Sequence, residues 1–463
     1  MKKQLRIILG LFLGLTLIGC EDLLNLDPQA SISDEIALST PSNVQTALVG
    51  AYGALGSSNT YGGMYIYLTE VYAAPKEELF WNGTFIDPGE IYNKAIVITN
   101  DFVSRYWSGS YNTINRANNI LAVDASIFTN AATKTKMDAE AKFIRALSYY
   151  NLIQVFGKAY NDGDPSKNLG VPLVLTPTRV VDETLQVERE TVAKVYEQIV
   201  KDLLDAKRDL PESNGFYANT YAASGFLARV YLAMGNYSAA LAEADRVLKS
   251  GEYSLFADIA ENYSRSSNGD ETIFAMQVTT TSGSNDNAVF FAPQPFGRAD
   301  IRIEAGHLAL YEEGDARGQL FVATGRGVMT TKYAVPSDPS ADPRRRNITV
   351  MRLAEMHLIR AEANVRLSSE VGLSPLVEMN ALRARSGLAA LESVNLQQIL
   401  RERKLELAFE GHLFADLKRL QGSTSSPDKP NIAWNSDSLV FPIPNREMLV
   451  NSKLVQNKGY TVN

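Results

Sequence analysis

The sequence has 463 residues, which is enough for a sizeable core and, by length alone, for roughly two or three domains. Its 45 basic and 52 acidic side chains give a net charge of −7. This balance leaves no broad basic surface for nucleic acid, so we exclude that class of partner. The single cysteine excludes an intrachain disulfide and a cysteine metal cluster.

The first residues have the pattern of a secretory signal peptide. Basic side chains near the start precede the largely apolar run Ile7–Ile18. As a helix this run would span about 18 Å, short of a hydrocarbon layer of ~30 Å, so a permanent transmembrane helix is not expected. We predict that residues 1–19 form the signal peptide and that residues 20–40 form a tether beginning at Cys20.

Helical periodicity of the apolar residues begins after the tether. In the clearest case, two segments meet at Gly235-Asn236, and Tyr, Leu and Ala recur in them at three- and four-residue steps. The pair resembles one unit of a tetratricopeptide-type array, which needs neighbouring units to bury its apolar face. The helices predicted up to residue 250 are Ser42–Gly53, Asp101–Leu121, Met137–Phe156, Thr191–Leu210, Ala218–Met234 and Tyr237–Lys249.

The second half of the chain alternates irregular segments with helices. Ile273–Thr280 alternates like a strand and leads into a loop rich in Ser, Gly and Asn. Further helices are predicted at Val350–Arg366, Leu376–Ser386 and Leu396–Glu410. Loop insertions are predicted at about 57–100, 157–190, 257–348 and 421–440. We therefore expect residues 41–463 to form one mostly α domain, a tetratricopeptide-like helix-pair scaffold with an irregular, loop-rich portion and a few short strands.

A series of motifs along the chain resembles the SusD/RagB family of outer-membrane lipoproteins. Leu17-Ile18-Gly19-Cys20 looks like a bacterial lipobox. The other motifs are Ala139–Ala146, Asp202–Pro211, Ala228–Leu232, Glu271–Ala275, Arg352–Ala363, Asn380–Leu388, Glu402–Gly411, Phe441–Pro444 and Gln456–Tyr460. Two minor departures are Leu413, where the family usually has arginine, and Lys458, where it has proline.

The resemblance implies both a location and a role. Cys20 would carry diacylglycerol and anchor the protein in the cell outer membrane, facing the cell surface. The loop-rich portion of the scaffold would face the substrate, and the protein would capture a glycan, or in some members a peptide. It would then deliver this cargo to a SusC-like TonB-dependent transporter. The implied function is binding rather than catalysis, and a scaffold that binds only protein remains an alternative.

A surface glycoside hydrolase is the enzymatic alternative. Glu402, Glu406 and Glu410 recur at four-residue steps, and glycoside hydrolysis needs a pair of carboxyl groups. One member of such a pair must stay protonated near neutral pH, whereas the cations at Arg401, Arg403 and Lys404 would lower its pKa. We therefore predict an ion-paired helix that stabilises the scaffold.

No cofactor is expected from the sequence. The three histidines, His307, His357 and His412, lie far apart along the chain, which does not predict a metal site. Calcium stays open, because the acidic residues of the predicted loops lack the spacing of a calcium-binding loop. These residues are Asp162, Asp164, Asp286 and Asp300.

Aromatic residues on loops are the candidates for ligand binding. A sugar ring has an apolar face and a rim of hydroxyl groups, so its site needs an exposed aromatic ring with amide or guanidinium groups at the edge. Phe80-Trp81-Asn82 provides this combination, and a second group lies near Arg298. Trp107 is expected in the core, whereas Trp434 stays undecided. The candidate ligand-binding residues are Trp81, Asn82, Phe80, Tyr65, Phe290, Phe291 and Arg298.

Overall fold

The computed structural model describes residues 37–179, 186–279, 283–333 and 342–461. The α-helices are α3 (Pro41–Leu55), α4 (Met64–Ala73), α5 (Ile86–Asn93), α6 (Asp101–Leu121), α7 (Ala131–Phe156), α8 (Val192–Asp209), α9 (Thr220–Ala233), α10 (Tyr237–Lys249), α11 (Glu261–Ser264), α12 (Asn287–Phe291), α13 (Ala305–Leu308), α14 (Leu353–Leu367), α15 (Pro375–Arg385), α16 (Leu396–Glu406), α17 (Leu413–Arg419) and α18 (Asn445–Val450). Short 3-10 turns are η2 (Ala125–Ile127), η4 (Ala316–Gln319), η5 (Pro343–Arg345) and η6 (Asp437–Leu439).

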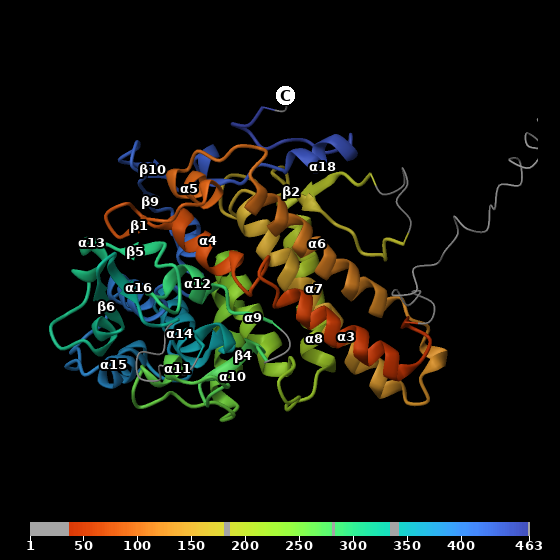
Figure 1. The fold of residues 1–463 in the computed structure, drawn as a ribbon. Helices are drawn as coiled ribbons and strands as arrows, with labels where there is room; N and C mark the ends of the chain where they lie inside the picture. The colour runs from red at the N-terminus through yellow and green to blue at the C-terminus, as the bar shows by residue number, and fades with distance from the viewer. Residues whose placement is uncertain (1–36, 180–185, 280–282, 334–341, 462–463) are drawn as a thin grey trace, which may run out of the picture.

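Helices packed on their neighbours in the chain form the body of the molecule. Contacts run from α6 to α7, α8, α9 and α10 in turn, and α10 then packs on α14. Figure 1 shows α3, α6, α7 and α8 lying side by side, with α14, α15 and α16 at the other end. The turn between α9 and α10 contains Gly235, whose φ of 74° is a left-handed conformation that glycine adopts without strain. The prediction of a mostly α helix-pair scaffold with a few short strands is confirmed.

Within the described residues, four small sheets are attached to this body. The strands are β1 (Leu79–Trp81), β2 (Leu169–Pro172), β3 (Arg189–Thr191), β4 (Thr272–Met276), β5 (Ile301–Ile303), β6 (Phe321–Thr324), β7 (Gly327–Thr330), β8 (Ile348–Arg352), β9 (Ser423–Thr424) and β10 (Ile432–Ala433). The largest sheet has the order β1-β5-β7-β6, and each of its pairings is antiparallel. The other sheets are the antiparallel pairs β2–β3, β4–β8 and β9–β10.

The core joins helices to a strand. Phe143 of α7 contacts Phe226 of α9 and Phe274 of β4 edge to face, with ring centroids 5.5 and 5.0 Å apart. Trp107, which we expected in the core, is 3% exposed. A second cluster with buried residues such as Leu358, Leu382 and Ile399 joins α14, α15 and α16. The main buried cluster extends from Val44 to Leu454 and so includes side chains from near both ends of the described chain.

Several expectations about local structure were wrong. The helix predicted from Met137 begins six residues earlier, at Ala131. The helix predicted from Val350 begins three residues later, because Ile348–Arg352 pairs with β4 as strand β8. The helix predicted through Glu410 ends at Glu406. The insertion predicted at about 57–100 contains α4, β1 and α5. All ten residues of α4 are buried, so this helix has no polar face to give it a helical periodicity.

The N-terminal predictions concern a different part of the chain. The signal peptide, Cys20 and most of the tether lie outside the described residues. Among the described residues, no helix is both long enough and apolar enough to cross a bilayer.

Candidate ligand-binding surface

Buried ion pairs surround the carboxyl groups that suggested a hydrolase. Glu406 is bound by Arg352 at 2.6 Å and by Arg385, and Glu410 is bound by Arg352 at 2.8 Å and Lys332 at 2.7 Å. Burial alone would raise the pKa of Glu406, but Arg385 and Arg352 outweigh it and lower the pKa to about 2. The pKa of Glu410 is also lowered, chiefly by Arg352 and Lys332 against the effect of burial.

The predicted ion-paired helix is therefore confirmed, although most of its partners are not the neighbouring cations we expected. They come from β8, α15 and the segment after β7, which lie far away in the sequence. A carboxyl held ionised at neutral pH cannot donate the proton that glycoside hydrolysis requires. The ion pairs therefore argue against Glu406 or Glu410 as the general acid of a hydrolase.

The histidines and loop aspartates are engaged in separate contacts. His307 contacts Glu78 at 3.3 Å, His357 contacts Glu378 at 3.1 Å, and the nearest carboxyl to His412 is Glu355 at 3.8 Å. The loop aspartates Asp162, Asp164, Asp286 and Asp300 contact Lys158, Lys167, Ser284 and Arg298 respectively. No group of three or more metal-ligating residues occurs in the part of the chain that the structure describes.

Strand β1 determines where the predicted aromatic residues point. Its residues pair with β5 as Leu79 with Ile303, Phe80 with Arg302 and Trp81 with Ile301. Successive side chains of a strand point to opposite faces, so Trp81 shares the inner face with Leu79. Trp81 is 7% exposed and Leu79 is fully buried. Phe80 lies on the outer face, half-buried, with the Arg302 guanidinium 4.5 Å from its ring centroid.

The prediction that Trp81 offers an exposed face to a sugar was wrong, because the segment is a strand rather than a loop. The indole lies 6.1 Å from the Phe290 ring and is covered by the chain that follows it. A Cβ on Gly83 would lie 2.4 Å from an indole carbon, so this position requires glycine for steric reasons. The indole Nε1 is buried without a hydrogen-bond partner among the described residues. Trp81 therefore supports the surface from below.

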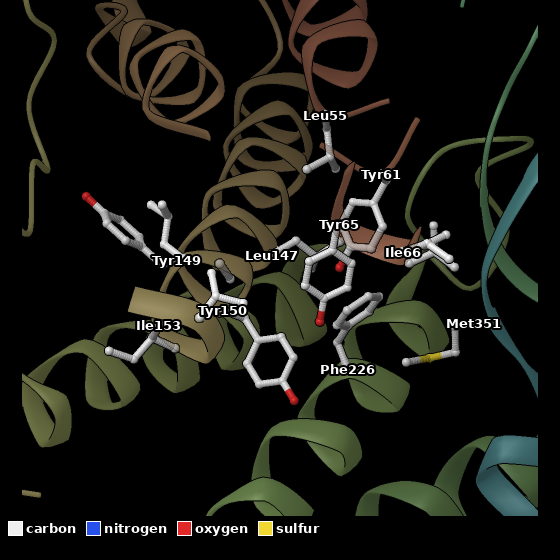
Figure 2. Close-up of a cluster of buried hydrophobic side chains, with 14 of the residues drawn as sticks. Leu55, Tyr61, Tyr65, Ile66, Leu147, Tyr149, Tyr150, Ile153, Phe226 and Met351 are labelled. Atoms are coloured by element: carbon white, nitrogen blue, oxygen red, sulfur yellow. The ribbon is translucent and has the colours of Figure 1, made fainter. Parts of the chain in front are cut away.

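Two other predicted residues lie in the core. Phe291 is fully buried and stacks on Tyr333 with ring centroids 5.1 Å apart. Tyr65 is 6% exposed and packs against Tyr61 at 5.1 Å, within the buried cluster that Figure 2 shows. Both were predicted to bind ligand, and the structure contradicts an exposed ring at either position because both side chains are buried. Phe290, 7% exposed, lies between Tyr67 and Trp81 and also supports the surface from below.

A different aromatic ring occupies the exposed position. Phe85, four residues after Trp81, is 42% exposed, and the Arg298 guanidinium lies 4.4 Å from its ring centroid. Arg298 donates to Thr84 Oγ1 at 3.0 Å and to Asp300 Oδ2 at 2.6 Å. We call the surface formed by Asn82, Thr84, Phe85, Ile86 and Arg298 the Phe85 platform.

Hydrogen bonds connect Asn82 of the platform to two other segments. The backbone N–H of Asn82 donates to the carbonyl of Asp300 at 2.7 Å, and Arg326 donates to the carbonyl of Asn82 at 3.3 Å. The side-chain amide of Asn82 is half-buried and has no hydrogen-bond partner among the described residues. The exposed part of the Phe85 ring can contact the apolar face of a sugar ring, while the Arg298 guanidinium above it and the amide of Asn82 can bind hydroxyl groups.

Sequence reasoning found part of the platform. Asn82 and Arg298 were predicted, and both bond Asp300. Trp81 and Phe290 lie beneath the platform, and Phe80 lies on the outer face of β1. It missed Phe85, although an aromatic residue just after Gly83-Thr84 was a usable signal. It also missed Arg326, which no local pattern marks, because this residue reaches Asn82 from the β6–β7 hairpin.

The fold and the platform define a class of protein. A helix-pair scaffold that holds an exposed aromatic ring beside polar donors, while its clustered carboxyl groups are locked in ion pairs, is a scaffold for binding. The comparisons with known proteins agree with this description.

The family model described as "Starch-binding associating with outer membrane" matches residues 24–232, and the model described as "SusD family" matches residues 307–460. The chain belongs to the SusD/RagB family. The SusD-like protein P2 of Formosa agariphila is 26% identical over 510 residues, which cover 96% of this chain and 98% of that protein.

Solved structures show the same fold. A SusD superfamily protein from Bacteroides thetaiotaomicron superposes with a TM-score of 0.79 at 25% identity, over 90% of this chain and 99% of that chain. The surface glycan-binding protein A of Bacteroides uniformis superposes with a TM-score of 0.75 at 20% identity, over 90% of this chain and 99% of that chain.

Proposed function

We propose that this protein is a lipid-anchored outer-membrane protein that binds an oligosaccharide on the Phe85 platform and delivers it to a SusC-like TonB-dependent transporter. The observation that carries the proposal is the exposed ring of Phe85 beneath the guanidinium of Arg298. Membership of a family whose model is described as starch-binding supports a carbohydrate ligand. A main buried cluster that includes both Val44 and Leu454 supports the assignment of residues 41–463 to one domain.

A glycan array tests the ligand. The chain from Glu21 onward contains the whole described core and is the form to use. We expect Phe85→Ala to weaken binding of any glycan found by about 1–3 kcal/mol, a roughly 5- to 150-fold loss. Phe216→Ala is the matched control, because Phe216 is 63% exposed and lies in the loop between α8 and α9.

Three outcomes of this test would count against the proposal. Equal effects of Phe85→Ala and Phe216→Ala would place the ligand elsewhere. Binding of peptides with no glycan bound would assign the platform to the peptide-binding alternative. Release of new reducing ends from a bound glycan would instead favour an enzyme.

The anchor and the transporter need separate experiments. We expect mass spectrometry of the mature protein from membranes to find diacylglycerol on Cys20, and we expect Cys20→Ser to release the protein from the outer membrane. Purification of the lipidated protein in mild detergent should recover a TonB-dependent barrel. Recovery of the protein without any such barrel would count against delivery.

A further inference from the structure

A second potential ligand site lies away from the Phe85 platform. A cavity of ≈ 370 Å³ lies between α4, α16 and α17. This volume is within the range of pockets that hold small ligands. Figure 1 shows α4 and α16 on the half of the molecule that carries β1 and β5.

Most of the cavity lining is aliphatic or aromatic. Leu79 and Phe409 are among the buried residues at its floor, with exposures of 0% and 3%. Half-buried leucines, including Leu310, Leu400 and Leu413, line it nearer the surface. The aliphatic part of this lining can bind an apolar chain. By proportion to a 150 Å³ cavity that accepts benzene, this one has room for a chain of about ten carbons together with a carboxylate group.

The acidic groups of the cavity already have partners. Glu78 accepts from Lys404 at 2.5 Å and contacts His307 at 3.3 Å. Asp416 accepts from Arg403 at 2.9 Å. The remaining acid, Glu70, accepts from the backbone N–H of Gly411 at 2.7 Å. These contacts leave little acceptor capacity in the lining for a cationic ligand.

Two basic groups of the same lining have donors to spare. Arg403 is 3% exposed, and its Nη1 is buried without a hydrogen-bond partner among the described residues. Arg401 is exposed and donates to the carbonyl of Leu310, and no described carboxyl group lies within 4 Å of it. A guanidinium with free N–H groups is a strong donor to a carboxylate.

We propose that this cavity binds a monocarboxylate with an unbranched aliphatic chain of about ten carbons, that is, a medium-chain fatty acid. The chain lies among the leucines, and the carboxylate pairs with the exposed guanidinium of Arg401. A glycan is a poor occupant, because its hydroxyl groups would lose water against an aliphatic wall without enough partners. The site goes beyond the proposed glycan function and shares no residue with the platform.

Calorimetric titration of the chain from Glu21 onward with decanoate, octanoate and 1-decanol tests the assignment. We expect one decanoate per chain. We also expect octanoate to bind about 15-fold more weakly, because each methylene contributes about 0.8 kcal/mol, or a factor of about four. 1-Decanol should bind more weakly than decanoate, because it lacks the charge.

Variants locate the site. Arg401→Glu should weaken decanoate about tenfold and leave 1-decanol unchanged, since it reverses the charge beside the carboxylate. Leu413→Trp should abolish binding of both, because the larger ring fills the cavity. The matched controls are Arg116→Glu, an exposed arginine on α6, and Leu248→Trp, a half-buried leucine on α10, and both should bind normally. Far-UV circular dichroism checks that each variant is folded.

Several results would overturn the proposal. One is that decanoate fails to saturate the protein. Another is that folded Leu413→Trp binds decanoate as well as the parent does. A third is that the two control variants lose as much affinity as Arg401→Glu and Leu413→Trp. Equal affinity for 1-decanol and decanoate, with no effect of Arg401→Glu, would show that the site does not recognise the carboxylate group. Loss of glycan binding in Phe85→Ala with decanoate binding intact would support two independent sites, so either proposal can fail without the other.

Discussion

Replacement of Arg352 by methionine tests whether buried ion pairs hold the scaffold together. Its side chain is 2% exposed and contacts Glu271 at 3.0 Å, Glu406 at 2.6 Å and Glu410 at 2.8 Å. These carboxyl groups come from just before β4, the end of α16 and the segment after α16. The guanidinium also donates to the backbone carbonyl of Glu406 at 2.6 Å. One side chain thus joins β8 to three other segments.

The expected loss of stability depends on the ion pairs that remain after Arg352→Met. Removing one partner of a buried pair costs about 3–5 kcal/mol, because the other charge stays buried without compensation. Glu406 and Glu271 would keep Arg385, and Glu410 would keep Lys332. We therefore expect a loss near the lower limit, about 3 kcal/mol. Because the free energy of unfolding of natural proteins is only about 5–15 kcal/mol, this loss is a large fraction of the total stability.

Urea unfolding followed by far-UV circular dichroism measures the effect. We expect a lower midpoint for Arg352→Met with an unchanged dependence on urea concentration. Lys194→Ala is the control, because its pair with Glu190 at 2.9 Å is exposed, with side chains 61% and 37% accessible. That variant should lose less than about 1 kcal/mol. A stability of Arg352→Met within about 1 kcal/mol of the parent would refute the reasoning.

Three further predictions concern the platform support and acid stability. Trp81→Ala should lower the free energy of unfolding by about 3–5 kcal/mol, measured by urea titration, because the indole is buried. Gly83→Ala should lower the thermal midpoint, because its methyl group would lie 2.4 Å from that indole; an unchanged midpoint would contradict the packing. The pKa of Glu406 falls from its ordinary 4.5 to about 2, so its stabilisation is complete above pH 4.5 and is lost as the pH falls toward 2. In the parent protein this loss in the free energy of unfolding amounts to about 3 kcal/mol. Glu406→Gln should make the free energy of unfolding depend less on pH over the same range.

Amphipathic helices could be predicted from the sequence with accurate boundaries. The predicted limits of α6 and α10 agree with the structure residue for residue. Each of these helices buries one face and exposes the other, so its apolar residues recur with the helical period. Helix α4 is buried on all sides and was missed, and β8 was merged with α14 because the two are continuous in the sequence.

The candidate site could be predicted only by region. The sequence identified the neighbourhood of Phe80–Asn82 and of Arg298, but not which rings are exposed. That depends on the pairing of β1 with β5, whose partner residues lie more than two hundred positions apart. A shift of this pairing by one residue would exchange the two faces of the strand. Local patterns do not contain such a register, so Trp81 was predicted in place of Phe85.

Asp300 can be used to test whether a residue of the platform region acts by positioning Arg298 rather than by contacting the ligand. It is 2% exposed, its carboxylate accepts from Arg298 Nε at 2.6 Å, and its backbone carbonyl accepts from the N–H of Asn82 at 2.7 Å. Immobilising a flexible side chain on binding costs about 0.5–1.5 kcal/mol, and Asp300 already holds Arg298 in place before the ligand arrives.

We therefore expect Asp300→Asn, which keeps the backbone contact and removes the charge, to weaken glycan binding by about 1 kcal/mol, or roughly fivefold. If Asp300 acts only by positioning Arg298, the same substitution should have no further effect on glycan affinity in an Arg298→Ala background. Titration of the parent, both single variants and the double variant with one glycan measures this coupling. Additive losses would show that Asp300 acts on the ligand by some other route, and the positioning argument would then be wrong.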